Sequence, residues 1–532
     1  MSPASGPWSG RRLHFVGVGG AGMSGYARAA HALGAQISGS DRADSPYLES
    51  LRADGVLEAS LGHDAANVPA GEGVEVVYSS AVAGENPERV AARERGLPER
   101  PRAQLLGELT ALKRTIAVAG THGKTTTASM LVHILKGAGM EPAWMVGASV
   151  GEGLPNARWG AGEWLVVEAD ESDRSMLSLV VEIAVLTNVE LDHHATFGSL
   201  HELRDAFREF LARARAAIVV WDRPELLELA RAAQVLGGAE PASIGSPSTA
   251  RAAVGSARGA VDPGMTGRAA AKTLEIVPYD LPDDADFRGG GSTFTWRGAR
   301  VHLSVPGAHN ALNAAGALEA ALLAGAAPER AVAGIEGFRG AGRRFQRLGE
   351  SPRGALVYDD YAHHPTEVAA TLSAARTLAH RRLLAVFQPH LYSRTTLLAR
   401  EFGAALAQAD VVAVLDVYPA RERAAEHPGV SGLLIAQAAA DASEGGAVYW
   451  LPTFADAEPV LRSLLDEGDL CLVMGAGDVD ALGRRLLEGA PGAQPRGTRT
   501  DRRSDAISLS ASAHAPVAQP THVDDPQVST PE

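Results

Sequence analysis

The chain has little cysteine and little lysine, and it carries no excess of positive charge. Cys471 is the one cysteine among 532 residues, so no disulfide can form within the chain, which fits the cytoplasm. Lysine and arginine number 49 against 63 aspartates and glutamates, which gives a formal net charge of −14. Proteins that grip nucleic acid by its phosphates usually carry a basic patch, and none is evident here. The composition therefore argues against nucleic acid as a partner.

Long apolar runs are also missing. The opening residues MSPASGPWSGRR lack the apolar core of a signal peptide, and no uninterrupted apolar run is long enough to cross a bilayer. We therefore expect a cytoplasmic protein without membrane insertion. Hydrophobic residues make up 45% of the chain, which indicates a globular fold, and 532 residues are too many for one hydrophobic core.

Apolar strands and helices alternate in three successive units, which predicts an α/β fold with parallel, doubly wound sheets. We place these units at residues 11–108, 109–338 and 339–490. Within the second unit, GSTFTWRGARVHLSV predicts a hairpin with its turn at Arg297-Gly298. Residues 491–532 are rich in Pro, Ser and Ala without periodicity, so we expect a disordered tail.

The sharpest local signal is GTHGKTTT, which begins at Gly120, follows an apolar strand and opens a helix. Glycines let backbone N–H groups turn toward a phosphate, and the helix N-terminus adds partial positive charge. Lys124 adds a full positive charge, and the hydroxyl of Thr125 can bind Mg²⁺. The loop departs from the Walker A pattern, which would have glycine where Val118 stands. An ordinary strand–helix turn is the alternative, and the sequence context favours phosphate binding.

An earlier loop, GVGGAG, also lies between a strand and a helix. Gly17, Gly19 and Gly22 match G-x-G-x-x-G, and Asp41 follows at about the spacing of a ribose-binding acid. Taken alone, the pattern fits a dinucleotide-binding unit. A glycine turn needed only for helix–sheet packing fits it equally well.

Polar side chains cluster where several predicted strands end, which is where open α/β sheets bind ligands. Four carboxylates end one strand and would repel one another in a dry site unless a divalent cation lay among them. The next strand ends in an aspartate and two histidines, which favour a metal or phosphate contact. These seven residues are Glu168, Asp170, Glu171, Asp173, Asp192, His193 and His194.

Each of the later polar clusters is weak evidence for a site when taken alone. Their order along the chain is the informative feature. They are His309, Asn310 and Asn313; Arg343 and Arg344; Asp359, Asp360, Tyr361, His363 and His364; and Gln388, His390, Tyr392 and Arg394.

Eight motifs in succession resemble the signatures of the Mur ligase family, and within it the alanine-adding members. They are GVGGAGMSG, GTHGKTTT, EADESD, TNVELDHH, PGAHNALNA, FRGAGRRF, DDYAHHPTE and FQPHLYSRT, and the resemblance spans residues 11–490. It implies three α/β domains: a Rossmann-like N-terminal domain for a UDP-sugar, a central P-loop ATPase domain, and a Rossmann-like C-terminal domain for an amino acid. It also implies an ATP- and Mg²⁺-dependent ligase that joins L-alanine to the lactyl carboxylate of UDP-N-acetylmuramate through an acyl phosphate, in peptidoglycan precursor synthesis. We expect a monomer or weak homodimer.

The resemblance also implies roles for individual residues. The UDP substrate would lie against Gly17, Gly19, Gly20, Gly22, Asp41 and Ser80. ATP would lie against Gly120, Thr121, His122, Gly123, Lys124, Thr125, Thr126 and Asn310, the last at the adenine. Metal would be held by Thr125, Glu168 and His193, and the amino acid would meet the sugar acid near Tyr361, His363, His390 and Arg394. The catalytic set would be Lys124, Glu168, His193, His363 and Arg344.

The chain departs from the family at two positions. Ala195 stands where a carboxylate often follows the Asp-His pair, and Leu391 stands where an arginine often follows QPH. The second departure leaves Arg394 as the candidate cation for the amino-acid carboxylate.

Three other functions fit part of the sequence. A ligase of the same superfamily could attach a peptide to the same nucleotide sugar. An NAD-dependent dehydrogenase would account for the first glycine loop and leaves GTHGKTTT and EADESD unexplained. A nucleotide-sensing protein without catalysis would not need the full set of Lys, His and carboxylate groups.

Overall fold

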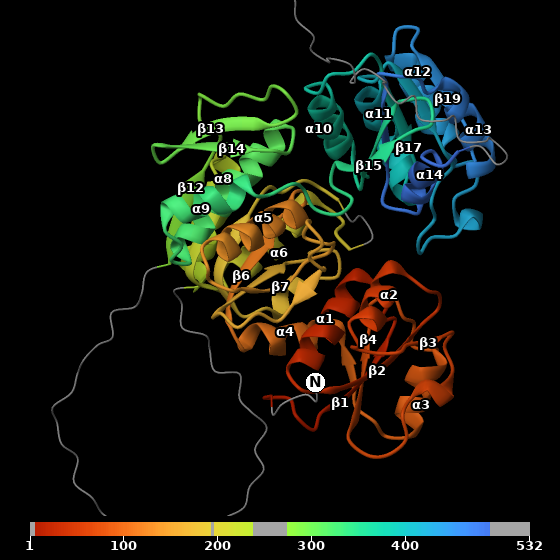
Figure 1. The fold of residues 1–532 in the computed structure, drawn as a ribbon. Coiled ribbons are helices and arrows are strands. Elements are labelled where there is room, and N and C mark those ends of the chain that lie inside the picture. The colour runs from red at the N-terminus through yellow and green to blue at the C-terminus, as the bar shows by residue number, and fades with distance from the viewer. Residues whose placement is uncertain (1–5, 193–195, 238–273, 490–532) are drawn as a thin grey trace, which may run out of the picture. The chain divides into compact units, whose positions relative to one another are not determined.

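The computed structural model describes residues 6–192, 196–237 and 274–489. In these ranges the strands form sheets of five, seven, two and six strands (Figure 1). The predicted tail and the predicted metal ligand His193 lie outside the described residues.

The first sheet is parallel throughout, because each of its strands is joined to its neighbour by a helix or a longer connection. In spatial order its strands are β3 (Ser60–Leu61), β2 (Gln36–Asp41), β1 (Arg12–Val16), β4 (Val74–Tyr78) and β5 (Glu99–Pro101). Its helices are α1 (Ala21–Ala32), α2 (Pro46–Ala53), α3 (Pro87–Glu94) and α4 (Arg102–Ala111), with a 3₁₀ turn η1 (Ala65–Asn67). The chain reverses its direction of winding at β1, so the loop after β1 lies at the position where such sheets bind ligands.

The central sheet is parallel except at β8, which pairs antiparallel with β7. In spatial order its strands are β12 (Glu275–Tyr279), β11 (Ala214–Trp221), β10 (Val181–Leu186), β6 (Arg114–Ala119), β9 (Trp164–Glu168), β7 (Ala143–Met145) and β8 (Ala157–Arg158). Alternate residues of β6 enter different cores: Ile116 and Val118 join one, and Ala117 and Ala119 join the other. This period of two buries both faces of the sheet and accounts for the uninterrupted apolar sequence of the strand.

Helices cover both faces of the central sheet (Figure 1). They are α5 (Lys124–Gly137), α6 (Leu200–Leu211), α7 (Pro224–Gly237), α8 (Ala308–Leu323) and α9 (Pro328–Glu336), with a 3₁₀ turn η2 (Ser175–Ser178). Helix α5 packs against α8 and α9. A Cβ on Gly137 would lie 2.6 Å from the Cα of Gly334, so α5 and α9 approach this closely because both positions are glycine.

The predicted hairpin is confirmed as β13 (Ser292–Trp296) and β14 (Ala299–Leu303), which lie beside α8 and α9 (Figure 1). Its two turn residues have positive φ, 48° at Arg297 and 83° at Gly298. Positive φ at both positions matches the right-handed twist of the two strands.

The last sheet is parallel except at its edge strand β15, which pairs antiparallel with β16. In spatial order its strands are β15 (Gln346–Glu350), β16 (Leu356–Asp360), β20 (Leu470–Met474), β17 (Leu383–Phe387), β18 (Val411–Val414) and β19 (Ala447–Trp450). Its helices are α10 (Pro365–Ala375), α11 (Tyr392–Leu406), α12 (Leu433–Ala442), α13 (Phe454–Leu464) and α14 (Val479–Arg485), with a 3₁₀ turn η3 (Ala424–Glu426).

The α/β class predicted from the sequence is therefore confirmed, with three parallel or mainly parallel sheets along the chain. No helix of the described ranges is long and apolar enough to cross a membrane. The motifs fall at the carboxyl ends of strands, since Gly120 follows β6 and its neighbours β9 and β10 end at Glu168 and Leu186. The topology thus brings three sequence motifs to one edge of the central sheet.

Candidate active site

The second glycine loop turns sharply between β6 and α5. Gly120 has φ of 130° and Gly123 has φ of 85°, and Gly123 caps α5 without a side-chain hydrogen bond. A Cβ at Gly120 would lie 2.1 Å from Thr187 Oγ1, and one at Gly123 would lie 2.7 Å from Asn313 Oδ1. Glycine is therefore required at both positions by backbone shape and by space. The first-turn N–H groups of α5 have no side-chain cap, as an anion site at a helix N-terminus requires.

Lys124 lies within this loop as a charged group. Its Nζ donates to Gly120 O at 2.6 Å and contacts both carboxylate oxygens of Glu171 at 2.9 Å. Burial alone would lower the pKa of Lys124, but the negative charges of Glu171 and Asp170 raise it above its usual value. The ammonium therefore stays protonated, and it is balanced by a carboxylate of its own chain.

Three of the four carboxylates at the end of β9 have basic partners within the protein. Arg102 of α4 binds Asp170 at 2.9 Å and Asp173 at 2.7 Å. Glu171 pairs with Lys124, as described above. Two basic side chains of the protein thus pair with three of the four carboxylates, and their charges offset only part of the negative charge.

Glu168 is the fourth, and it keeps an environment suited to a metal. Its Oε1 accepts a hydrogen bond from Gly147 N at 2.6 Å, and a Cβ on Gly147 would lie 3.1 Å from Oε2. Burial raises the pKa of Glu168, an effect opposed by the Gly147 hydrogen bond and the charge of Lys124. A partly exposed carboxylate beside the Thr125 hydroxyl is a hard oxygen donor set, which fits Mg²⁺.

The segment after β10 packs against the second glycine loop, Gly120–Thr126, which we call the phosphate loop. Sequence reasoning missed these contacts. Asn188 Oδ1 accepts from His122 N at 2.9 Å, and Thr187 Oγ1 donates to His122 O at 2.6 Å. The Thr121 hydroxyl donates to Glu190 O at 2.9 Å. The one available signal was position, since these residues directly follow a buried strand that neighbours β6.

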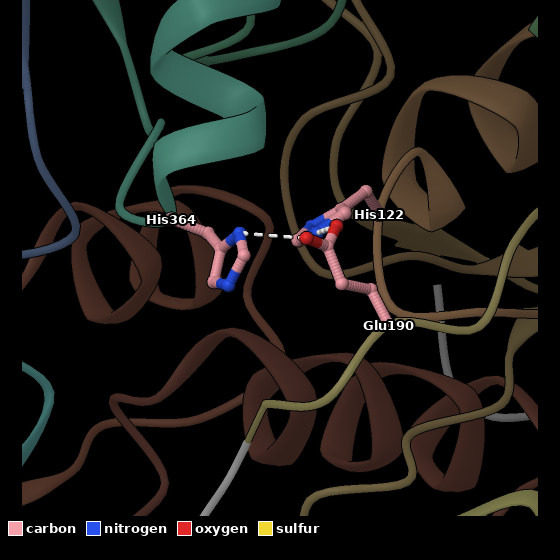
Figure 2. A group of neighbouring side chains, drawn as sticks. All are labelled: His122, Glu190 and His364. Carbon is pink, nitrogen blue, oxygen red and sulfur yellow. Dashed lines mark hydrogen bonds and ion pairs between the residues drawn. The ribbon is translucent and has the colours of Figure 1, made fainter. Parts of the chain in front are cut away.

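His122 is held between two carboxylates from different parts of the chain. Its Nε2 lies 3.0 Å from Glu190 Oε2, and its Nδ1 lies 3.2 Å from Glu367 Oε1 on α10. Burial would lower the pKa of His122, but the two carboxylates raise it to about 9. Carboxylate oxygens only accept at neutral pH, so both ring nitrogens carry protons. His364 lies on the other side of Glu190, with Nδ1 3.9 Å from Glu190 Oε1 (Figure 2).

Two adjacent arginines before β15 have different partners. Arg343 is bound by Asp359 at 3.1 Å and donates to the carbonyls of Gly475 and Gly477. Arg344 instead donates to Thr125 Oγ1 at 3.3 Å. They share one neighbour, because the guanidinium groups of Arg343 and Arg344 lie 5.1 and 5.0 Å from the Tyr361 ring centre. The structure therefore brings Arg344 to the phosphate loop, as the resemblance implied, and it places Arg343 against the last sheet.

The candidate amino-acid residues lie together near the loop after β10. The ring centres of His363 and Tyr361 are 5.3 Å apart, and those of His363 and His390 are 6.0 Å apart. Burial lowers the pKa of His363 to about 4 and that of His390 to about 3. Both imidazoles are therefore neutral near pH 7.

Arg394 has a partner that the sequence did not suggest. Its Nη2 and Nε lie 2.7 and 3.2 Å from Asp192 Oδ1, and its Nη1 lies 3.3 Å from His390 Nδ1. Both charged side chains are almost fully buried, at 3% and 4% exposure. The guanidinium is thus fixed in place before any substrate arrives.

A cavity of about 390 Å³ lies beside the phosphate loop. It is lined by His122, Gly123 and Thr126 of the loop, and by Asn310, Asn313, Trp221 and Arg344 among others. Asn310 Nδ2 donates to Pro306 O at 2.7 Å, which orients the amide at the start of α8. Asn310, predicted to contact adenine, therefore shares one cavity with the phosphate loop.

The first glycine loop is held by a hydrogen bond to the side chain of Asp41. Gly17 has φ of 82°, and Gly19 N donates to Asp41 Oδ2 at 2.7 Å. Gly20 caps α1 without a side-chain hydrogen bond, and α1 begins just before Gly22. Ser80 is exposed in the turn after β4, the strand beside β1. Asp41 thus holds the loop directly, a role that its spacing alone did not reveal.

Three family models match the chain in succession. They are the Mur ligase family, catalytic domain over residues 12–114, the Mur ligase middle domain over 118–239, and the Mur ligase, glutamate ligase domain over 343–477. The chain belongs to the Mur ligase family. The family resemblance noted from the eight motifs is therefore confirmed.

Curated members of the Mur ligase family match nearly the whole chain. UDP-N-acetylmuramate–L-alanine ligase of Mycobacterium sp. (strain JLS) is 42% identical over 502 residues, 92% of this chain and 96% of that protein. The enzyme of the same name from Rhodococcus jostii (strain RHA1) is 41% identical over 501 residues, 90% of this chain and 96% of that protein.

Solved structures of the family share the fold. UDP-N-acetylmuramate-alanine ligase from Thermotoga maritima superposes with a TM-score of 0.69 at 25% identity, covering 89% of this chain and 98% of that chain. A murein peptide ligase from Psychrobacter arcticus gives a TM-score of 0.63 at 23% identity, covering 90% and 98%. The second shows the fold alone.

Proposed function

We propose that this Mur ligase joins L-alanine to the lactyl carboxylate of UDP-N-acetylmuramate, with ATP converted to ADP and phosphate. The observation that carries the proposal is the 42% identity to an enzyme of that name over nearly the full length of both chains. The proposed division of labour is residues 11–108 for the UDP-sugar, 109–338 for ATP and 339–490 for the amino acid. The dehydrogenase alternative loses its support, because its one motif lies within a Mur ligase family match.

ATP would bind with its phosphates on the Gly120–Thr126 loop and its adenine toward Asn310. The uncapped N-terminus of α5 and the ammonium of Lys124 would bind the phosphates, and the 390 Å³ cavity next to them would take the nucleoside. Entry of the γ-phosphate would displace part of the contact between Lys124 and Glu171. Arg344, already at Thr125, would then balance the negative charge that moves in the transition state.

Mg²⁺ would be held by Thr125 and Glu168, and by His193 if the resemblance holds there. The ion would neutralise phosphate charge and orient the γ-phosphate for attack. The donor chemistry supports this, because Glu168 is oriented by Gly147 and has a raised pKa that a cation would lower.

Bond formation would proceed in two steps. The lactyl carboxylate of the sugar attacks the γ-phosphorus, the bond to the ADP oxygen breaks, and an acyl phosphate forms. The alanine amine, formed when its ammonium loses one proton, then attacks the acyl carbon, the carbon–oxygen bond to phosphate breaks, and the nitrogen loses a second proton and keeps one as the amide N–H. The chain positions the three reactants and excludes water that would hydrolyse the acyl phosphate.

His363 is our candidate for the base that takes a proton from the amine. Its Nδ1 lies 2.9 Å from Tyr361 O and 3.2 Å from Glu367 Oε2, and both oxygens accept only. The neutral ring must therefore carry its proton on Nδ1, which leaves the lone pair on Nε2. Because the pKa of His363 is lowered to about 4, this basic form predominates near pH 7.

Arg394 would bind the alanine carboxylate with Asp192 as its orienting partner. Within the described residues, three of its five N–H donors are directed to Asp192 and His390, and the other two could bind a carboxylate. A guanidinium already fixed by a buried partner loses little further freedom when the amino acid binds. The UDP-sugar would bind the first glycine loop, which Asp41 holds in shape.

One assay tests the function. The purified chain is mixed with ATP, Mg²⁺, UDP-N-acetylmuramate and L-alanine, and phosphate release is measured with each component omitted in turn. Phosphate release should require all four components. Efficient release with a peptide in place of alanine, and none with alanine, would instead assign the chain to the peptide-attaching branch. Release that is independent of the nucleotide sugar would refute both.

A further inference from the structure

One cluster of side chains at the edge of the proposed ATP site offers metal ligands that the proposed reaction does not use as such. His122, Glu190 and His364 offer two imidazoles and a carboxylate whose ligand atoms all lie within 4.8 Å of one another (Figure 2). They come from the phosphate loop, the segment after β10 and the residue that caps α10. Two histidines and one carboxylate form a common protein donor set for zinc-like ions.

The spacing suits a first-row divalent ion with small side-chain movements. Donors about 2.1 Å from a tetrahedral ion lie about 3.4 Å apart. Here His122 Nε2 and Glu190 Oε2 are separated by 3.0 Å, and His364 Nδ1 and Glu190 Oε1 by 3.9 Å. These two gaps differ from the required separation by about half an ångström. The two histidine rings, with centroids 4.8 Å apart, complete the group, whose ligand atoms all lie within 4.8 Å of one another. An ion would therefore draw each donor inward by about 1 Å or less.

The groups behind these donors also match those of a metal site. Glu367 accepts from His122 Nδ1, which leaves Nε2 directed at Glu190. A carboxylate behind a liganding histidine fixes the ring and its tautomer. Thr366 Oγ1 donates to Glu190 Oε1 at 2.7 Å and so orients the carboxylate. Thr366 N donates to His364 Nδ1 in a long hydrogen bond of 3.4 Å, which an ion at this nitrogen would replace.

We propose that His122, Glu190 and His364 form a binding site for Zn²⁺ or a similar borderline transition-metal ion, distinct from the Mg²⁺ position at Thr125 and Glu168. On binding, the ion replaces the proton on His122 Nε2, and that proton leaves to solvent. Three protein ligands leave a fourth tetrahedral position for water or an anion. Imidazole favours zinc-like ions over Mg²⁺, so excess Mg²⁺ does not fill the site.

An ion in this site would link the phosphate loop to the start of α10, because His122 and His364 belong to these two segments. His122 and Glu190 both line the nucleotide cavity, so the ion would lie at its edge. Metal binding should therefore stabilise the folded chain in proportion to its affinity.

The test measures metal binding directly and needs no ligase activity. Untagged full-length chain is titrated with ZnCl₂ by calorimetry in the presence of excess MgCl₂. It is also titrated with CoCl₂ and followed by visible absorption. His364→Asn is the test variant, since asparagine can still cap α10 but is a poor zinc ligand. His302→Asn is the matched control, because His302 is exposed on β14.

The wild type and His302→Asn should each bind one zinc at this site and give the intense visible bands of tetrahedral cobalt. His364→Asn should weaken that binding at least ~10-fold and lose the bands. Zinc at about a hundred times Kd should raise the melting temperature of the wild type by a few degrees, and less in His364→Asn. Glu190→Gln should give the same loss by removing the carboxylate.

Equal zinc affinity in the wild type, His364→Asn and Glu190→Gln would overturn the proposal, because the ion would then bind elsewhere. Absence of zinc binding by the wild type would overturn it too. Failure of the phosphate-release assay would bear on the ligase function alone, since no arm of the metal experiment uses a substrate.

Discussion

Lys124 should have two separable roles, one in stability and one in catalysis. Its Nζ contacts both oxygens of Glu171 at 2.9 Å, and the Glu171 side chain is 1% exposed. Removing one member of a buried ion pair typically costs ~3–5 kcal/mol, because the other charge stays in a poorly solvated place. Lys124→Met should therefore lower the free energy of unfolding by about 3 kcal/mol, and it should abolish phosphate release.

A second substitution separates these two losses. Lys124→Met combined with Glu171→Gln removes both charges and keeps similar volumes, so most of the lost stability should return. Catalysis should not return, since no cation would replace the ammonium at the transferring phosphate. Loss of one such preorganised group typically lowers the rate ~10²–10³-fold.

The measurements are chemical denaturation of the four members of this double-mutant cycle and phosphate release under saturating substrates. Lys136→Met is the control, because Lys136 is exposed in the last turn of the same helix α5. It should change stability by less than about 1 kcal/mol and leave the rate near wild type. If the double variant regained phosphate release, Lys124 would act through Glu171 alone and the catalytic assignment would be refuted.

Three further predictions concern other parts of the chain. Burial would raise the pKa of Glu88, but hydrogen bonds from His14, Asn67 and Ser40 outweigh it and lower the pKa to about 2. The ionised Glu88 should therefore stabilise the folded chain by ~2–3 kcal/mol above pH 4.5, and this contribution should be lost as the pH falls toward 2. Glu88→Gln should remove this acid dependence in denaturation curves. Trp221 lines the nucleotide cavity, so ATP should change tryptophan fluorescence in the wild type but not in Trp221→Phe. A Cβ on Gly19 would lie 2.9 Å from Asp41 Oδ2, so Gly19→Ala should weaken UDP-N-acetylmuramate binding ~10-fold or more in calorimetry and leave ATP binding unchanged; equal affinities for the sugar would contradict the placement of that substrate.

Strands with continuous apolar sequence were predictable from the chain alone, and those at sheet edges were not. The strands before the second glycine loop and before Glu168 are buried on both faces, so they contain the continuous apolar runs IAVA and WLVV. The edge strand Gln346–Glu350 reads QRLGE and is half exposed, so it carries no hydrophobic signal. The edge strand Glu275–Tyr279 contains Pro278, which an edge tolerates and an interior strand does not.

In the candidate site too, local features could be predicted from the sequence and long-range contacts could not. The phosphate loop was predictable because its glycines, Lys124 and Thr125 are contiguous and obey one local rule. The partners of these residues were not, because they lie far away in sequence. Arg102 meets Asp173 across 71 residues, and His122 meets Glu367 across a still longer separation. Such pairs depend on which strands become neighbours, and no local pattern encodes that.

Arg343 and Arg344 show that residue type and position in a motif do not by themselves predict which groups a side chain contacts. Both are arginines next to each other in one motif, yet one is bound by Asp359 and two carbonyls and the other reaches Thr125. Positive φ at Arg343 and at Phe345 turns the chain on either side of Arg344, 55° and 50° respectively. Such conformations cost of order 1–3 kcal/mol each and persist where surrounding contacts hold them. The contacts of Arg343 are well placed to offset that strain, and they direct Arg344 toward the phosphate loop.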